Sequence, residues 1–240
     1  RQFISGAVQA PSTASLAFSG FVPGATSAAT EEFNSSTLVT TAGAWASGGN
    51  VNTSRGQSTG AGSQTAGLMF GGASPGSPGI FDETEEFNGT SWSEVNDLPG
   101  GFIDHQGTGT QTAGLSSGGT PAPGGYSTSS FEYDGSNWTA GGSLNLGRGN
   151  MAGAGTQTAT AIFGGTRAAL TPGDHKVETE EYNGTAWTSG GNLPAAQFNQ
   201  FGTGTQTAAL SASGGPPMPS ASAEYDGTSW AAGGNVITPR

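Results

Sequence analysis

The stretch EEYNGTAWTSGGNLP, residues 180–194, decides the fold, because pieces of it return along the chain. Related phrases read EEFNGTSW at 85–92, FEYDGSNW at 131–138 and AEYDGTSW at 223–230. A phrase used this often is typical of a repeat architecture and not of a catalytic loop. Each copy contains Asn-Gly, Asp-Gly or a close variant, which favours a two-residue hairpin turn with positive φ angles. The stretch therefore predicts one strand–turn–strand hairpin per repeat.

A second phrase, built around glutamine, follows each tryptophan at a constant distance. An interval of 19 residues separates the members of the pairs Trp45–Gln64, Trp92–Gln111, Trp138–Gln157 and Trp187–Gln206. Counted from Trp230 past Arg240 and on from Arg1, Gln9 again lies 19 residues away, so the chain holds five repeats of average length 48. We therefore expect one blade to be shared between residues 1–20 and 221–240, because its inter-strand hydrogen bonds would close a ring.

Each repeat is long enough for four short strands. In the best-preserved repeat we expect them at 150–156, 159–165, 177–183 and 185–193. The first of these contains mainly glycine, alanine and threonine, which suits the crowded innermost position of a blade. The predicted fold is therefore all-β: a five-bladed β-propeller with four-stranded antiparallel blades, forming a single domain over residues 1–240.

Aromatic residues of the two outer strands are expected to form the core between neighbouring blades. Burial of each is worth about 1.5–3 kcal/mol. These structural residues are Trp45, Trp92, Trp138, Trp187, Trp230, Phe87, Tyr133, Tyr182 and Tyr225.

A family resemblance rests on ATAIFGG (159–165) and VETEEYNGTAWTSGGNLP (177–194). A double glycine after an apolar strand, then Tyr-Asn, Trp and Leu, resembles the kelch repeat over nearly the whole chain. The resemblance implies a β-propeller but no single activity, since kelch proteins include enzymes, lectin-like binders and protein scaffolds. The arginine after the fourth strand occurs only as Arg55 and Arg148, and the phrase GTQTA is not typical of the family. The Gly/Thr-rich style is also similar to propeller arrays encoded by marine bacteriophages.

Composition excludes several classes of function. Seventeen acidic residues against six basic ones give a net charge of −11, which disfavours nucleic acid as a partner. No apolar run approaches 18–20 residues, so no membrane insertion is expected. The chain has no cysteine and two histidines, whereas the copper site of galactose-oxidising kelch enzymes needs a cysteine and several histidines. We expect no metal and no cofactor.

The connections between strands divide into two kinds, one on each face of the ring. Because strands alternate in direction, the short first–second and third–fourth turns share one face, and the variable second–third and fourth–first connections share the other. Stiff, variable loops often present ligands. Candidate ligand-binding residues on the variable face are Phe102, Asp104, His105, Arg148, Phe198 and Phe201. The alternative is that these aromatics only cover the core near the mouth of the ring.

No catalytic residues are assigned. Asp104 and His105 are adjacent and would point apart in a strand, and His175 lies in a Pro-Gly loop. Pairs such as Glu85-Glu86 and Glu180-Glu181 repeat on the third strand, and we interpret them as solvated edge residues.

The predicted function is a non-catalytic binding or structural module. We expect it to be extracellular or virion-associated, with glycans or a protein as partner. Two alternatives remain open. One is a glycan-active hydrolase or lyase that uses Asp104 and acidic loop residues, and the other is a structural spacer in a larger assembly.

Overall fold

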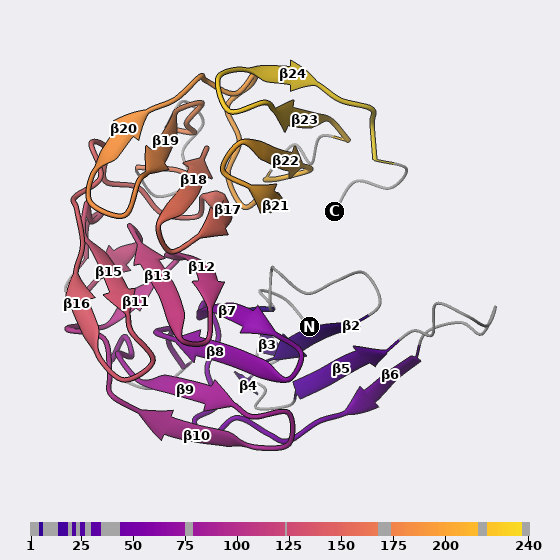
Figure 1. The fold of residues 1–240 in the computed structure, drawn as a ribbon, viewed down its shortest axis with the longest axis vertical. Coiled ribbons are helices and arrows are strands. Elements are labelled where there is room, and N and C mark those ends of the chain that lie inside the picture. The colour runs from indigo at the N-terminus through magenta and orange to yellow at the C-terminus, as the bar shows by residue number, and fades with distance from the viewer. Residues whose placement is uncertain are drawn as a thin grey trace.

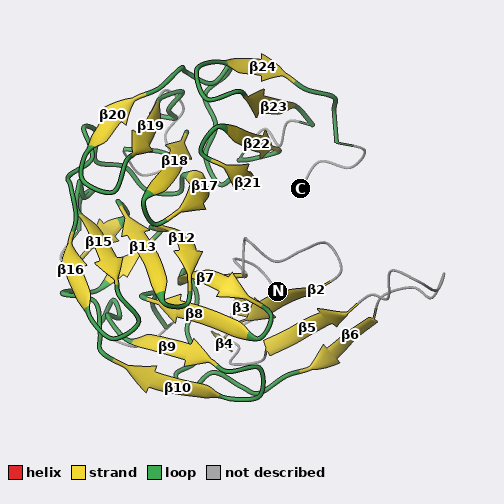
Figure 2. Ribbon diagram, in the orientation of Figure 1, coloured by secondary structure: helices red, strands yellow, loops and turns green. Residues whose placement is uncertain are grey.

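The computed structural model is built from strands and connections, with no helix among the residues that it describes (Figure 2). Those residues are 5–6, 14–18, 21–22, 25–26, 30–34, 44–74, 79–122, 124–167, 174–215 and 220–236, and their side chains are described from Ser47 onward. Accordingly, this part of the chain contains no helix long and apolar enough to cross a membrane.

Five four-stranded antiparallel sheets follow one another along the chain, and we number these blades one to five. The first blade contains β1 (Ser5–Gly6), β2 (Ala14–Phe18), β5 (Thr30–Asn34) and β6 (Ala44–Ser47). The second contains β7 (Thr59–Ser63), β8 (Ala66–Phe70), β9 (Thr84–Phe87) and β10 (Trp92–Val95). The third contains β12 (Gln106–Thr110), β13 (Ala113–Ser117), β15 (Ser130–Tyr133) and β16 (Trp138–Ala140).

The last two blades have the same strand order. The fourth contains β17 (Ala152–Thr156), β18 (Ala159–Phe163), β19 (Thr179–Tyr182) and β20 (Trp187–Ser189). The fifth contains β21 (Phe201–Thr205), β22 (Ala208–Ala212), β23 (Ser222–Tyr225) and β24 (Trp230–Ala232). Two further pairs lie in connections: β3 (Phe21–Val22) with β4 (Ala25–Thr26), and β11 (Phe102–Ile103) with β14 (Thr120–Pro121).

The five blades of this β-propeller form an arc around a common axis, with the innermost strand of each blade nearest the axis (Figure 1). Every sheet uses four strands from one continuous stretch, so the expected blade shared between residues 1–20 and 221–240 is wrong for the described strands. The constant interval from tryptophan to glutamine gives the length of the repeat, but it does not specify which strands pair with one another. The third strand pairs with the second strand that shortly precedes it in the chain, because closing a short connection costs less conformational entropy than closing a long one.

The prediction of two different faces is confirmed. The glycine two residues after the second strand donates its backbone N–H to the connection that enters the next blade: Gly72 to the carbonyl of Phe102, and Gly119 to that of Arg148, each over 2.8 Å. On the other face, Gln111 in the turn between β12 and β13 reaches the carbonyl of Phe87, beside the hairpin turn of the second blade. The two kinds of connection therefore cluster separately.

Neighbouring blades are joined by one repeated set of hydrogen bonds. An indole N–H donates to a hydroxyl, a tyrosine hydroxyl donates to a glutamate, and a glutamine amide donates to two backbone carbonyls. From the third blade to the second, these bonds run from Trp138 to Thr84 (3.0 Å), from Tyr133 to Glu86 (2.9 Å), and from Gln111 to Gly67 (3.0 Å) and Phe87 (2.8 Å). Trp187, Tyr182 and Gln157 donate likewise from the fourth blade, and Trp230, Tyr225 and Gln206 from the fifth.

The core between the blades contains the aromatic residues of the outer strands. Phe87, Tyr133, Tyr182, Tyr225, Trp92, Trp138 and Trp187 are buried, and Trp230 is partly exposed. The side chain of Trp45 lies outside the described residues. Each tyrosine packs on the tryptophan across its hairpin, with ring centroids 4.8–5.0 Å apart. The interiors between blades are therefore aromatic layers crossed by a few directed hydrogen bonds.

Candidate functional site

The connections that enter the blades have one backbone feature in common. Two residues after the position of Arg55 and Arg148, the chain adopts a left-handed conformation at a residue other than glycine. These residues are Gln57 (φ 55°), Asp104 (φ 57°), Asn150 (φ 56°) and Asn199 (φ 53°). They account for four of the five non-glycine residues with positive φ in the described part of the chain. Such conformations are sparsely populated and gather at functional sites.

The four residues lie around one polar pocket on the variable face. The pocket has a volume of about 200 Å³, and its lining is Gln57, Ser58, Asp104, His105, Asn150, Met151 and Asn199. Backbone hydrogen bonds hold the lining together: the N–H of Asn150 donates to the carbonyl of Asp104, and the N–H of Asn199 donates to the carbonyl of Asn150, both over 2.8 Å. We call this feature the axial pocket.

Asp104 is the only acidic residue that lines the axial pocket. Gln57 donates its side-chain N–H to the Asp104 Oδ1 over 3.1 Å. Burial raises the pKa of Asp104, while hydrogen bonds from Gln57 and Asn150 act in the opposite direction. Tyr126 approaches from the connection between β14 and β15, and burial together with the nearby Asp104 charge raises its pKa. A partly buried carboxyl among amides, with an aromatic ring nearby, is suited to polar recognition.

His105 lies beneath the pocket and is part of the core. Its Nδ1 is 2.9 Å from the Ser116 hydroxyl, and its ring lies between Phe70 and Phe102, with centroids 5.4 Å and 6.1 Å away. Burial lowers the pKa of His105 to about 4. The imidazole is therefore neutral at physiological pH, and it shapes the floor of the pocket without adding charge.

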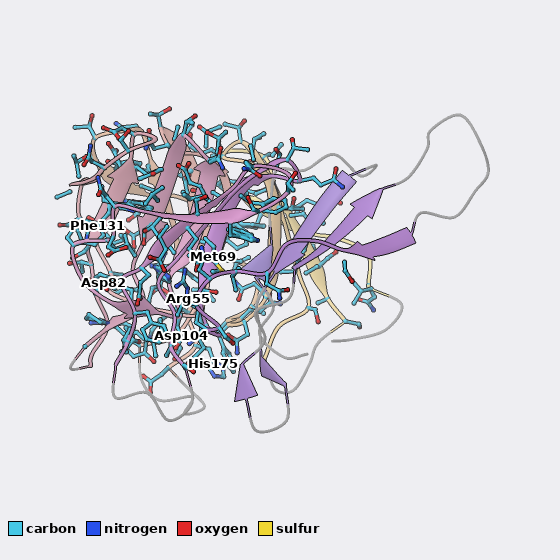
Figure 3. All side chains as sticks on the ribbon, turned by 90° about the horizontal axis from the view of Figure 1, so that it is seen from below. Arg55, Met69, Asp82, Asp104, Phe131 and His175 are labelled. Atoms are coloured by element: carbon cyan, nitrogen blue, oxygen red, sulfur yellow. The ribbon has the colours of Figure 1, made fainter. Side chains whose placement is uncertain are left out.

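The six candidate residues occupy different environments. Asp104 and His105 line the axial pocket, with Asp104 toward one face of the ring in Figure 3. Phe102 and Phe198 are buried: the ring of Phe102 packs on Phe131 (5.6 Å) and that of Phe198 on His175 (4.2 Å). Both aromatics thus cover the core, as the alternative interpretation stated.

Arg148 is buried in an ion pair within its own blade. Its Nη1 lies 2.9 Å from Glu180 Oε1, and Glu180 also accepts hydrogen bonds from the backbone N–H (2.6 Å) and side-chain N–H (3.0 Å) of Asn145. The exposed fractions of the two charged side chains are 0% and 2%. The expectation that these glutamates are solvated is therefore wrong for Glu180, and for Glu85, which makes the same contacts with Arg55 and Asn52.

Asn145, Arg148 and Glu180 form a triad that occurs in some blades and is replaced as a whole in others. The second and fourth blades have Asn, Arg and Glu at these positions. The third blade has Pro99, Phe102 and Phe131, and the fifth has Pro194, Gln197 and Ala223. Proline has no N–H to donate, and it occurs in the two blades that have no glutamate to accept one. Arg148 is therefore a structural residue, whose charge Glu180 neutralises.

Phe201, the last candidate, lies away from the axial pocket lining. It is the only exposed large hydrophobic residue in the described chain, with an exposed fraction of 58%, and it begins β21 of the last blade in the arc. Its position corresponds to Ala152 in the fourth blade, a residue next to the following blade's Gly202.

Sequence reasoning missed Gln57, Asn150, Asn199 and Tyr126. The first three carry a recognisable signal, a polar residue two positions before the innermost strand and two positions after the site occupied by Arg55, Arg148 or Gln197. Asp104 carried a different signal, because it stands with Phe102 and His105 in a connection whose sequence does not repeat. Tyr126 lies in a variable connection whose course no repeat pattern specifies.

The axial pocket can donate and accept hydrogen bonds, and it contains one carboxyl group. The described residues contain no group of three or more His, Cys, Asp or Glu side chains that could hold a metal ion. A glycosidase needs two carboxyl groups across one cleft, roughly 5–10 Å apart, and the pocket lining supplies Asp104 alone.

Comparison with known proteins identifies the fold. No protein-family model matches the sequence, and no curated protein sequence matches it. Among solved structures, the chain is similar to that of YjhT, with a TM-score of 0.79 and 14% sequence identity, over 100% of this chain and 85% of the YjhT chain. At this level of identity the similarity shows the propeller-like all-β fold alone.

Proposed function

We propose that this protein is a non-catalytic recognition module that binds a hydroxyl-rich ligand, such as a glycan, in its axial pocket. The observation that supports this most directly is the convergence of Gln57, Asp104, Asn150 and Asn199 on one pocket from four successive blades. Amide and carboxyl groups can pair with both the donor and the acceptor of a sugar hydroxyl. A neutral ligand also avoids placing a second charge beside a carboxyl whose pKa burial already raises.

The backbone of the site favours binding by a preformed surface. Interblade hydrogen bonds fix Asp104, Asn150 and Asn199 in their left-handed conformation before any ligand arrives. Less conformational freedom is then lost on binding. A location on a virion or at a cell surface, and a protein in place of a glycan as partner, remain predictions from the sequence.

The left-handed conformation allows a sharp test. Glycine adopts positive φ without strain, so Asn150→Gly and Asn199→Gly remove side chains while preserving the backbone. Labelled protein would be screened on a glycan array, and binders measured by calorimetry. We expect each variant to weaken binding about tenfold or more, in line with the loss of one or two hydrogen bonds. Ser213→Gly is the matched control, because Ser213 has a φ of 61° and does not line the pocket.

Two outcomes would contradict the proposal. One is glycan binding that both Asn150→Gly and Asn199→Gly retain, which would place the site elsewhere. The other is turnover of a polysaccharide by the wild-type protein that disappears in Asp104→Asn, which would establish the hydrolase or lyase alternative.

A further inference from the structure

The repeated contacts between blades define two different sides of every blade. We call the side that contacts the following blade the forward face, and the side that contacts the preceding blade the rear face. Forward faces accept the repeated hydrogen bonds, as Thr84 and Glu86 do in the second blade. Rear faces donate them, through Trp, Tyr and Gln. A blade therefore joins its neighbours with a fixed direction.

The forward face of the fifth blade lacks the cover that the other forward faces have. Leu210 is partly exposed, whereas the equivalent Leu68, Leu115 and Ala161 are buried. Ser222 is also partly exposed, whereas the equivalent Thr84, Ser130 and Thr179 are buried.

The same face carries the acceptors and the aromatic group that a following blade would need. Glu224 is exposed and stands at the position where Glu86, Glu132 and Glu181 accept a tyrosine hydroxyl. Phe201 pairs with Ala212 across the two inner strands, where the fourth blade has Ala152 paired with Phe163. The exchange of a small and a large residue between two facing positions keeps one aromatic group on the forward face. In the fourth blade that aromatic group contacts the following blade at Gly202.

The first blade has the complementary sequence on its rear positions. Phe33 pairs with Trp45 in the register of Phe87 with Trp92, so Trp45 stands at the repeat position that tryptophan occupies in the other four blades. Gly6 follows Ser5 in the register of Gly60 after Thr59, at a position that is glycine in every blade. The two ends of the arc therefore match by repeat position: the fifth blade carries the acceptor positions, and the first carries tryptophan and glycine at the positions that contact a preceding blade elsewhere.

We propose that the forward face of the fifth blade binds the rear face of the first blade in a second copy of the chain. The contact continues the interface already present between blades, with β21 of one copy beside β1 of the other. Such a head-to-tail contact joins two different surfaces, so it leaves one of each free and can propagate. This inference is independent of ligand binding in the axial pocket.

One position makes the test selective. Phe33 stands where three later blades have the tyrosine that bonds to glutamate over 2.6–2.9 Å. Phe33→Tyr should add a bond to Glu224 of the other copy and tighten association about tenfold, as expected for a hydrogen bond to a charged group. Phe87→Tyr is the matched control, because it makes the same change at an interface inside one chain.

Sedimentation velocity of the intact chain over about a hundredfold concentration range measures the association. We expect concentration-dependent oligomers, loss of association in Phe201→Asp, unchanged association in the exposed-site control Ala140→Asp, and a gain in Phe33→Tyr that Glu224→Gln removes. A monomer at every concentration would overturn the proposal, as would oligomers that Phe201→Asp leaves intact. A Glu224-dependent rise in melting temperature of a monomeric Phe33→Tyr variant would also overturn it, because the first blade would then close on the fifth within one chain.

Discussion

Replacing Arg148 with methionine is expected to lower the free energy of unfolding by about 3 kcal/mol, because Glu180 would remain buried without its cation. Breaking a buried ion pair costs about 3–5 kcal/mol. The lower end applies here, since Glu180 keeps N–H donors from Asn145 and, over 3.3 Å, from Leu146. For a chain of this size the melting temperature should fall by about 6–12 °C.

The third blade supplies the matched rescue for this variant. It has Pro99, Phe102 and Phe131 at the same positions. The triple variant Asn145→Pro, Arg148→Phe, Glu180→Phe therefore replaces the whole triad of the fourth blade with the uncharged residues of the third. We expect it to recover stability to within about 1 kcal/mol of wild type, because hydrophobic replacement of a buried ion pair is often neutral. Urea unfolding followed by tryptophan fluorescence would measure both. A loss below about 1 kcal/mol in the single variant, or a triple variant no more stable than the single, would refute the reasoning.

Three further predictions concern stability. The stabilising effect of a neutral, buried His105 is present above about pH 6.5 and is lost as the pH falls toward 4, because the unfolded chain binds the proton more readily than the folded chain. The free energy of unfolding of wild type should therefore fall by about 2 kcal/mol between pH 7.5 and pH 5 relative to that of a His105→Gln variant. Urea midpoints that shift equally in the two proteins between these pH values would contradict this. Gln157→Ala removes two interblade hydrogen bonds, of 2.9 and 2.7 Å, and should destabilise by about 1–2 kcal/mol in the same urea assay, whereas an unchanged midpoint would show that water replaces both bonds. Gly202→Ala would bring a Cβ within 2.8 Å of the Ala152 Cβ and should cost about 1–3 kcal/mol, partly recovered by adding Ala152→Gly; a melting temperature equal to wild type would disprove the close approach.

The repeat pattern predicted what depends on local sequence. A hairpin forms at Asn183-Gly184 as expected, and the strand expected at 159–165 is β18, Ala159–Phe163. The turn itself differs from the expected two-residue type: residues 183–186 separate the paired Tyr182 and Trp187, and Gly184 has a positive φ (88°) whereas Asn183 does not. The pattern failed where pairing between strands decides the result, as for the shared blade, since spacing along a chain does not specify hydrogen-bond partners. The burial of Glu180 could have been predicted from the sequence, because Glu180 lies two residues from Tyr182 on the same strand and alternate residues of a strand share a side of the sheet.

The axial pocket could be foreseen only in part, because its side chains do not repeat while its backbone does. The φ angles of Gln57, Asp104, Asn150 and Asn199 lie within 53–57°, and hydrogen bonds between neighbouring connections hold three of these residues in place. The backbone therefore does not depend on which side chain it presents, and glycine would fit each position without strain. Asp104 alone is ionisable among the four, so exchanging it for asparagine changes the charge of the site and leaves its shape. Binding that survives Asp104→Asn but not Asp104→Gly would assign recognition to hydrogen bonding, whereas loss in both would assign it to charge.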